Sequence, residues 1–179
     1  RIPSDDEIKE LRQKLGFGKT EITDFEGEAN YSVRMPAGTQ ISFGAVAKGC
    51  ASKYAIDAMR KNGVTSGIVS LGGNVQTLGT KPDGSNWTVA VEDPNDTGSY
   101  VGTLTVGETA IITSGSYQRY FIGPDGMKYH HLIDPSTGKP ADNDLVSVTI
   151  VCSDGTLADC LSTAMFILGE SAALKYWRE

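Results

Sequence analysis

The sequence predicts an α+β fold with a mainly antiparallel or mixed sheet and two or three helices packed on it. Short apolar or alternating runs, broken by turn residues, recur along the chain and are typical of strands. Longer segments with helical periodicity are fewer, so strands outnumber helices. With 179 residues, 39% of them hydrophobic, the chain is long enough for one globular domain with its own core.

The N-terminal half begins with a short helix that we expect to be structural only. Ser4 and Glu7 form a capping box, and Gly16 ends the segment. Strands are expected at residues 31–35 and 39–43, followed by a helix over residues 45–61. The later runs are read as strands at residues 66–71, 75–78, 87–91, 110–113, 117–122, 127–131 and 145–152.

The last long helix, expected over residues 155–169, carries Asp159 and Thr163 one turn apart among apolar or small side chains. Such a helix is normally buried, and an acid buried without a partner is costly. The spacing places two oxygen donors on one face, as a hard divalent cation requires. The alternative is that Asp159 accepts a hydrogen bond from a neighbouring backbone, although its position in the helix interior argues against a capping role.

Charge and composition narrow the class of function. The net charge of -6 argues against a nucleic-acid partner, which would need a basic face. No apolar run approaches the length of a membrane span. Cys50, Cys152 and Cys160 match neither a zinc site nor a disulfide framework and are read as small core residues.

Residues 42–49 form a glycine-bracketed junction between a strand and a helix, with Lys48 as its cation. Unpaired N–H groups and the positive end of a helix dipole suit a phosphate group. The order of residues is not that of a Walker loop, and for this segment alone a plain helix start with a solvated lysine is the favoured interpretation. Residues 71–74 contain paired glycines, which suit either a tight turn or the close approach of a ligand ring.

Residues 129–140 contain His130 and His131, which are the only histidines of the chain. Asp134 and Pro135 force a turn that can place an imidazole and a carboxylate side by side. An exposed strand end with an Asx turn is the alternative interpretation.

Taken together, the motifs resemble those of the ApbE-type FAD:protein FMN transferases. They occur in the family's order over most of the chain: Gly44-Ala-Val-Ala-Lys-Gly49, Val69-Ser-Leu-Gly-Gly73, Thr113-Ser-Gly-Ser-Tyr117, His131-Leu-Ile-Asp-Pro-Ser-Thr-Gly138, and Ala158-Asp159 with Thr163. The resemblance implies an ApbE-like, T-fold-related domain that lacks its N-terminal third. Residues 1–179 would then be a single domain that forms the C-terminal part of a larger one.

The resemblance also implies roles for individual residues. Magnesium would be held by the Ala45 carbonyl, the side chains of Asp159 and Thr163, and the Ser162 carbonyl. Lys48 and Ile133 would contact FAD, and His131 would transfer a proton during catalysis. Ser42 stands where the family usually has an aspartate that contacts FAD, and a serine cannot accept hydrogen bonds as a carboxylate does. Many members of the family also carry an acidic residue at the positions of Ser116, Asn74 and Lys53.

The activity implied is the magnesium-dependent transfer of FMN from FAD to a threonine of a target protein, with release of AMP. Typical targets are flavin-carrying subunits of membrane redox pumps at the bacterial envelope, where the family is anchored as a lipoprotein or secreted into the periplasm. Two alternatives stay open. Water in place of the threonine would give a magnesium-dependent FAD pyrophosphatase, and loss of turnover would leave a flavin-binding module.

Overall fold

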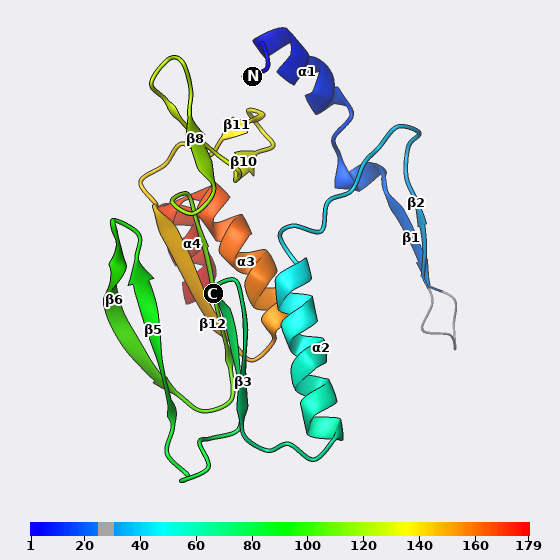
Figure 1. Cartoon of the computed structure of the whole chain (residues 1–179). Helices are drawn as coiled ribbons and strands as arrows, with labels where there is room; N and C mark the ends of the chain where they lie inside the picture. Colours follow the sequence, from blue (N-terminus) through cyan, green and yellow to red (C-terminus); the bar gives the residue numbers. More distant parts are fainter. Residues whose placement is uncertain (25–30) are drawn as a thin grey trace. The chain divides into compact units, whose positions relative to one another are not determined.

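The computed structural model describes residues 1–24 and 31–179, and Figure 1 shows the arrangement of their helices and strands along the chain. These residues form two compact units. The first comprises Arg1–Ser42 and Asp134–Lys139, and the second comprises Phe43–Ile133 and Pro140–Glu179. The α+β class is confirmed by the elements of both units, whereas the assignment of a single domain stays a prediction.

The first unit begins with α1 (Asp5–Gln13), whose capping box is present as predicted. The Glu7 N–H donates to Ser4 Oγ at 3.2 Å, and the Ser4 N–H donates to Glu7 Oε2 at 2.8 Å. The short 3₁₀ helix η1 (Phe17–Lys19) leads to β1 (Glu21–Asp24), which pairs antiparallel with β2 (Tyr31–Arg34).

The strand expected at residues 39–43 is wrong, because these residues adopt no strand in the structure. The Thr39 N–H bonds Pro36 O in a turn, and Ile41 and Phe43 stay exposed at 50% and 67%. An apolar run needs a neighbouring strand to satisfy its backbone, and none of the described strands pairs with this one.

The second unit is built on a four-stranded antiparallel sheet in the order β12-β7-β4-β3. Its strands span Gly67–Leu71 (β3), Asn74–Leu78 (β4), Ala110–Gly115 (β7) and Ser147–Cys152 (β12). Gly72 and Gly73 join β3 to β4 with φ of 55° and 89°. Two central residues with positive φ define the tight hairpin turn that was one of the two predictions for these glycines.

Three helices accompany this sheet: α2 (Ala47–Lys61), α3 (Gly155–Leu168) and α4 (Glu170–Arg178). α2 contacts β3 and β4, and α3 contacts β7, β12 and α2. Buried Ala110 and Ile112 of β7 pack against Ala158 of α3, which explains why α3 is so apolar. α4 is an addition to the predicted helices and follows directly after Gly169. No helix in the described part of the chain is both long and apolar enough to cross a membrane.

The remaining strands form two-stranded ribbons. β5 (Trp87–Asp93) pairs with β6 (Asp96–Val106), β8 (Tyr120–Ile122) with β9 (Lys128–His130), and β10 (Ile133–Asp134) with β11 (Lys139–Pro140). β6 went unpredicted because its polar start and two glycines interrupt the alternation of apolar residues.

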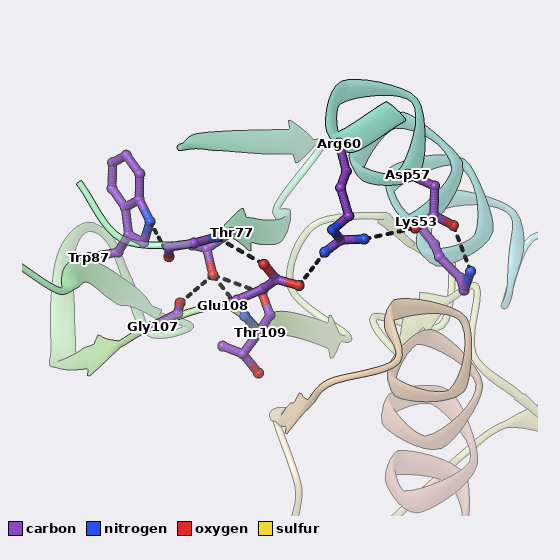
Figure 2. Close-up of polar contacts among 9 residues, drawn as sticks. Lys53, Asp57, Arg60, Thr77, Trp87, Gly107, Glu108 and Thr109 are labelled. Atoms are coloured by element: carbon purple, nitrogen blue, oxygen red, sulfur yellow. Dashed lines mark hydrogen bonds and ion pairs between the residues drawn. The ribbon is translucent and has the colours of Figure 1, made fainter. Parts of the chain in front are cut away.

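A polar network ties α2 to the sheet (Figure 2). Arg60 of α2 pairs with Glu108, whose Oε2 accepts the Gly79 N–H at 3.0 Å. Thr77 Oγ1 donates to Gly107 O at 2.7 Å, and it accepts the Thr109 N–H at 2.9 Å. The ion pair is half exposed and contributes little by itself. The bonds to backbone groups hold residues 107–109, and with them Glu108, against the end of β4.

Candidate functional site

The first turn of α2 is capped by a side chain from another helix. Val46, at the N-cap, makes no side-chain cap, and the first turn holds no acidic residue. Asp159 of α3 takes that place, since its Oδ2 accepts the Gly49 N–H at 2.7 Å while only 2% of the residue is exposed. The carboxylate therefore lies at the positive end of the α2 dipole. Asp159 thus accepts a hydrogen bond from a backbone N–H, as the alternative interpretation expected. This bond uses one of its two carboxylate oxygens.

The close contact between α2 and α3 depends on two glycines. A Cβ on Gly49 would lie 2.1 Å from Gly155 O and 2.6 Å from Asp159 Cβ. A Cβ on Gly155 would lie 2.5 Å from Gln76 Oε1. A side chain at Gly49 would push the helices apart and withdraw the Asp159 carboxylate from the turn that it caps, whereas one at Gly155 would first displace the end of the Gln76 side chain.

Three hydroxyl groups meet one turn further along α3. Ser114 Oγ of β7 lies 2.8 Å from Ser162 Oγ and 3.2 Å from Thr163 Oγ1. Ser162 Oγ also donates to Asp159 O at 3.0 Å. The predicted pair Asp159 and Thr163 thus faces the first turn of α2 and the end of β7, with Ser114 as an oxygen donor that the site prediction lacked.

Lys48 of the first turn of α2 reaches β4. Its Nζ donates to Asn74 Oδ1 at 3.1 Å, and Asn74 is fully buried. Lys48 is half-buried and bonded to Asn74, so it is only partly solvated, at a helix start as the plain interpretation expected. Ala45 lies in the turn that leads into α2, ahead of Gly49, whose N–H bonds Asp159.

The two histidines have opposite surroundings. His130 is partly buried, with Nε2 3.1 Å from Ala141 O and Nδ1 accepting the Leu132 N–H at 3.3 Å. Its ring meets Phe166 edge-on at a centroid distance of 5.7 Å. Burial lowers the pKa of His130, which favours the neutral ring. Both ring nitrogens are engaged, so His130 is a structural residue.

His131 is exposed at the end of the β8–β9 hairpin. Its Nδ1 lies 3.3 Å from Arg119 O, and its backbone N–H donates to the same oxygen. A carbonyl can only accept, so this contact puts the proton of a neutral ring on Nδ1 and leaves the Nε2 lone pair available as a base.

The Asp134 carboxylate forms hydrogen bonds within its own turn. Its Oδ1 accepts the Ser136 N–H at 2.7 Å and its Oδ2 accepts the Ser136 hydroxyl at 2.8 Å, bonds that lower the pKa of this carboxyl. The Asx turn is confirmed, and the pairing of Asp134 with an imidazole is absent from the contacts of the described residues.

The remaining predicted contacts to FAD are dispersed. Ile133 opens β10 with 43% of its surface exposed. Ser42 ends the first segment of the first unit, whereas the other predicted site residues belong to the second unit.

The whole chain, residues 1–179, matches the ApbE family. The protein belongs to that family. It is 34% identical to the FAD:protein FMN transferase of Treponema pallidum over 99% of this chain and 52% of the relative, and 38% identical to one from Klebsiella pneumoniae over 74% and 40%. The crystal structure of the ApbE protein of Thermotoga maritima superposes with a TM-score of 0.86, at 37% identity over 99% of this chain and 54% of the other. The chain thus spans about half the length of the relatives that it matches.

The oxygen donors of this ApbE-family chain fit a hard cation. The described residues contain no cluster of three or more His, Cys, Asp and Glu side chains that would hold a metal. One buried carboxylate with neighbouring hydroxyls and carbonyls is instead the kind of site in which magnesium keeps waters and takes further ligands from substrate phosphates. The predicted ligands Asp159, Thr163, Ser162 and Ala45 would be such donors.

Gly49 and Ser114 are the residues of the ApbE-family site that sequence reasoning did not assign. Both stand inside motifs that carried the resemblance, but nothing in those motifs pairs either residue with α3. Their roles come from contacts between elements distant in sequence, for which a single sequence contains no signal.

Proposed function

We propose that this chain forms the metal-binding and histidine-bearing half of a FAD:protein FMN transferase. The observation that carries the proposal is the buried Asp159 carboxylate held against the first turn of α2, beside Lys48 and a group of hydroxyls. Family membership and the names of the relatives support the reaction. The substrate is then FAD, and the acceptor is a threonine hydroxyl of a target protein.

In this reaction the threonine oxygen attacks the phosphorus on the FMN side of the diphosphate. The bond from that phosphorus to the bridging oxygen breaks, and AMP leaves with the bridging oxygen. Magnesium, when bound, neutralises charge that develops on the diphosphate oxygens. Asp159 and Thr163 would hold it by their side chains, and Ala45 and Ser162 by their carbonyls.

His131 is proposed to take the proton of the attacking hydroxyl. Its exposed position leaves room for a macromolecular substrate, and the contact between Nδ1 and Arg119 O presents Nε2 as the base. Lys48 would contact the diphosphate as a cation, and Ile133 and Ser42 would complete the contacts to FAD.

The target and the compartment are parts of the same proposal. The resemblance supports a flavin-carrying subunit of a membrane redox pump as the target. It also supports a location at the bacterial envelope, with a lipoprotein anchor outside this chain.

The test is to incubate the chain with FAD, magnesium and a target domain that bears the acceptor threonine. Flavin fluorescence that stays with the denatured target, together with one AMP per flavin transferred, supports the transferase. Free FMN with AMP and no labelled target would show a pyrophosphatase instead. FAD binding without AMP release would show a flavin-binding module.

A further inference from the structure

The three hydroxyl groups between β7 and α3 form a hydrogen-bonded chain whose direction follows from its last acceptor. Ser162 Oγ lies 3.0 Å from the backbone oxygen of Asp159, and a carbonyl can only accept, so Ser162 donates its single proton there. Ser114 Oγ is 2.8 Å from Ser162 Oγ and must therefore be the donor in that contact. The proton of Ser114 is thus directed at Ser162.

The same reasoning gives the direction of the contact with Thr163. Thr163 Oγ1 lies 3.2 Å from Ser114 Oγ, whose own proton is already engaged, so Thr163 donates and Ser114 accepts. The hydroxyl relay then runs from Thr163 through Ser114 and Ser162 to the backbone oxygen of Asp159. Because Thr163 is the donor at the start of this relay, both lone pairs of its oxygen remain available.

The position of Ser114 is set by the packing of β7 on α3. Ile112, two residues earlier and therefore on the same face of the strand, is 0% exposed and packs with Ala158 of α3. Ser114 continues this face, so its hydroxyl meets the next turn of α3, which carries Ser162 and Thr163. The core packing of the second unit therefore holds the acceptor of the Thr163 proton in place.

A threonine within a helix has another acceptor for its proton. Its hydroxyl can turn and bond a carbonyl of the preceding turn, and threonine divides between two rotamers for this reason. A cation binds the lone pairs of the oxygen, so the proton must point away from the ion. Ser114 offers an acceptor outside the helix, and it thereby fixes the orientation of the Thr163 hydroxyl.

We propose that Ser114 is a positioning residue for the cation site, because it accepts the Thr163 proton and so presents the Thr163 lone pairs to magnesium. It acts through Thr163 and does not bind the ion itself. Partners of this kind orient metal ligands in many proteins. The inference rests on the proposed function, because it takes Thr163 as a magnesium ligand.

The test measures magnesium binding to the full chain without FAD, by calorimetric titration. Ser114→Ala removes the acceptor, and Ser114→Thr keeps a hydroxyl at the same place. Thr113→Val is the matched control, since it breaks a similar hydroxyl pair, Thr113 Oγ1 and Thr149 Oγ1 at 2.8 Å, one residue earlier in the same strand. Thr163→Val removes the ligand, and the double variant Ser114→Ala with Thr163→Val shows whether Ser114 acts through it.

We expect Ser114→Ala to weaken magnesium binding about tenfold, as loss of a partner of a metal ligand typically does. Ser114→Thr should recover most of the wild-type affinity, and Thr113→Val should bind as the wild type does. In the Thr163→Val background, Ser114→Ala should add no further loss. Saturating magnesium should restore AMP release from FAD in Ser114→Ala, because only the affinity for the ion has changed.

Ser162→Ala provides a second route to the same conclusion. It removes the acceptor of the Ser114 proton, which can then turn to the Thr163 oxygen and compete with the ion, so magnesium binding should weaken here too. Thermal unfolding without magnesium verifies that each variant is folded. If Ser114→Ala fails to fold, Ser162→Ala decides alone: weaker binding supports the proposal, and unchanged binding overturns it.

Wild-type magnesium affinity in a folded Ser114→Ala variant would overturn the proposal. So would losses from Ser114→Ala and Thr163→Val that multiply in the double variant, because Ser114 would then act independently of Thr163. A wild-type chain that binds magnesium but transfers no FMN would refute the proposed function, while the ranking of the Ser114 variants still tests this inference. A wild-type chain that binds no magnesium would refute this inference whether or not it transfers FMN.

Discussion

The contact between α2 and α3 and the end of the β8–β9 hairpin both carry residues proposed for the reaction, but they are built differently. At the first, Asp159 and Gly49 are 110 positions apart in sequence and meet in the interior. At the second, His131 and Arg119 are 12 positions apart and meet at the surface. The first region depends on the packing of the whole second unit, whereas the second depends on one local ribbon.

Because of this difference, a mutation in the first region should affect folding as well as the reaction, and a mutation in the second should affect the reaction alone. A buried carboxylate that caps a helix contributes to folding as well as to any metal site, so its removal affects both. An exposed imidazole contributes little to folding, so its removal reports on chemistry alone. The predictions below use this separation.

Gly49→Ala should give the largest effect on stability. The added methyl would meet the backbone of α3 at 2.1 Å, and a backbone atom cannot turn aside as a flexible side chain can. We expect the free energy of unfolding to fall by about 3 kcal/mol or more, measured by urea denaturation. Gly102→Ala in β6 is the control, because a Cβ there meets open space, and it should change stability by less than about 0.5 kcal/mol. Equal stability of the two variants would contradict the close contact of α2 and α3.

His131→Asn should lower the rate of FMN transfer about 100-fold or more, the usual contribution of a general base, with little change in unfolding free energy. His130→Asn, at the neighbouring position, should instead destabilise the fold, because the ring packs on Phe166 and bonds two backbone groups. Rate assays and urea denaturation of both variants measure the two effects. A slower transfer in His130→Asn and a loss of stability in His131→Asn would show that the proposal names the wrong histidine as the base.

Asp159→Ala and Asp159→Asn should differ in stability but not in activity. Asparagine keeps an oxygen that can accept the Gly49 N–H, whereas alanine leaves this buried donor unsatisfied at a cost of about 1–3 kcal/mol. Both variants lose the carboxylate charge, so both should lose magnesium-dependent AMP release while FAD binding is partly kept. Undiminished AMP release from Asp159→Asn would count against the metal assignment.

The smallest effect concerns the pH dependence of stability. Burial lowers the pKa of His130 below its ordinary value of 6.5, so the unfolded chain binds more protons than the folded chain between the two values. The stability provided by the neutral ring is present above pH 6.5 and is lost as the pH falls through the lower, folded pKa. Urea denaturation at pH 7.5 and about pH 5.5 should therefore show a smaller loss of stability in His130→Gln than in the wild type. Identical losses would show that His130 has no part in the acid sensitivity.

Most elements of the second unit could be predicted from periodicity. The expected helix over residues 45–61 is α2, and the expected strands at residues 66–71 and 75–78 are β3 and β4. β6 and the failed strand at residues 39–43 show the limit of this approach. A strand exists only if another strand pairs with it, and alternation of side chains does not reveal whether a partner is near.

The sequence predicted which residues belong to the candidate site better than it predicted which residues they contact. The apolar surroundings of Asp159 indicated a buried acid, and burial at 2% confirms that inference. The partner of the acid, the Gly49 N–H, belongs to another helix, and a sequence pattern indicates only caps within the same helix. Lys48 was recognised as a cation beside a helix start, but its bond to Asn74 lies across 26 positions of sequence.

By itself the sequence determined features that act over a few residues. The capping box of Ser4 and Glu7, the turn of Gly72 and Gly73 and the Asx turn of Asp134 all satisfy backbone groups close to them, so they form wherever those residues occur. Only the tertiary structure decided that α2 is capped by Asp159, that Lys48 meets a neutral amide and that one histidine is buried while the next is exposed. These outcomes depend on which apolar faces pack together, and packing brings together groups that no local pattern connects.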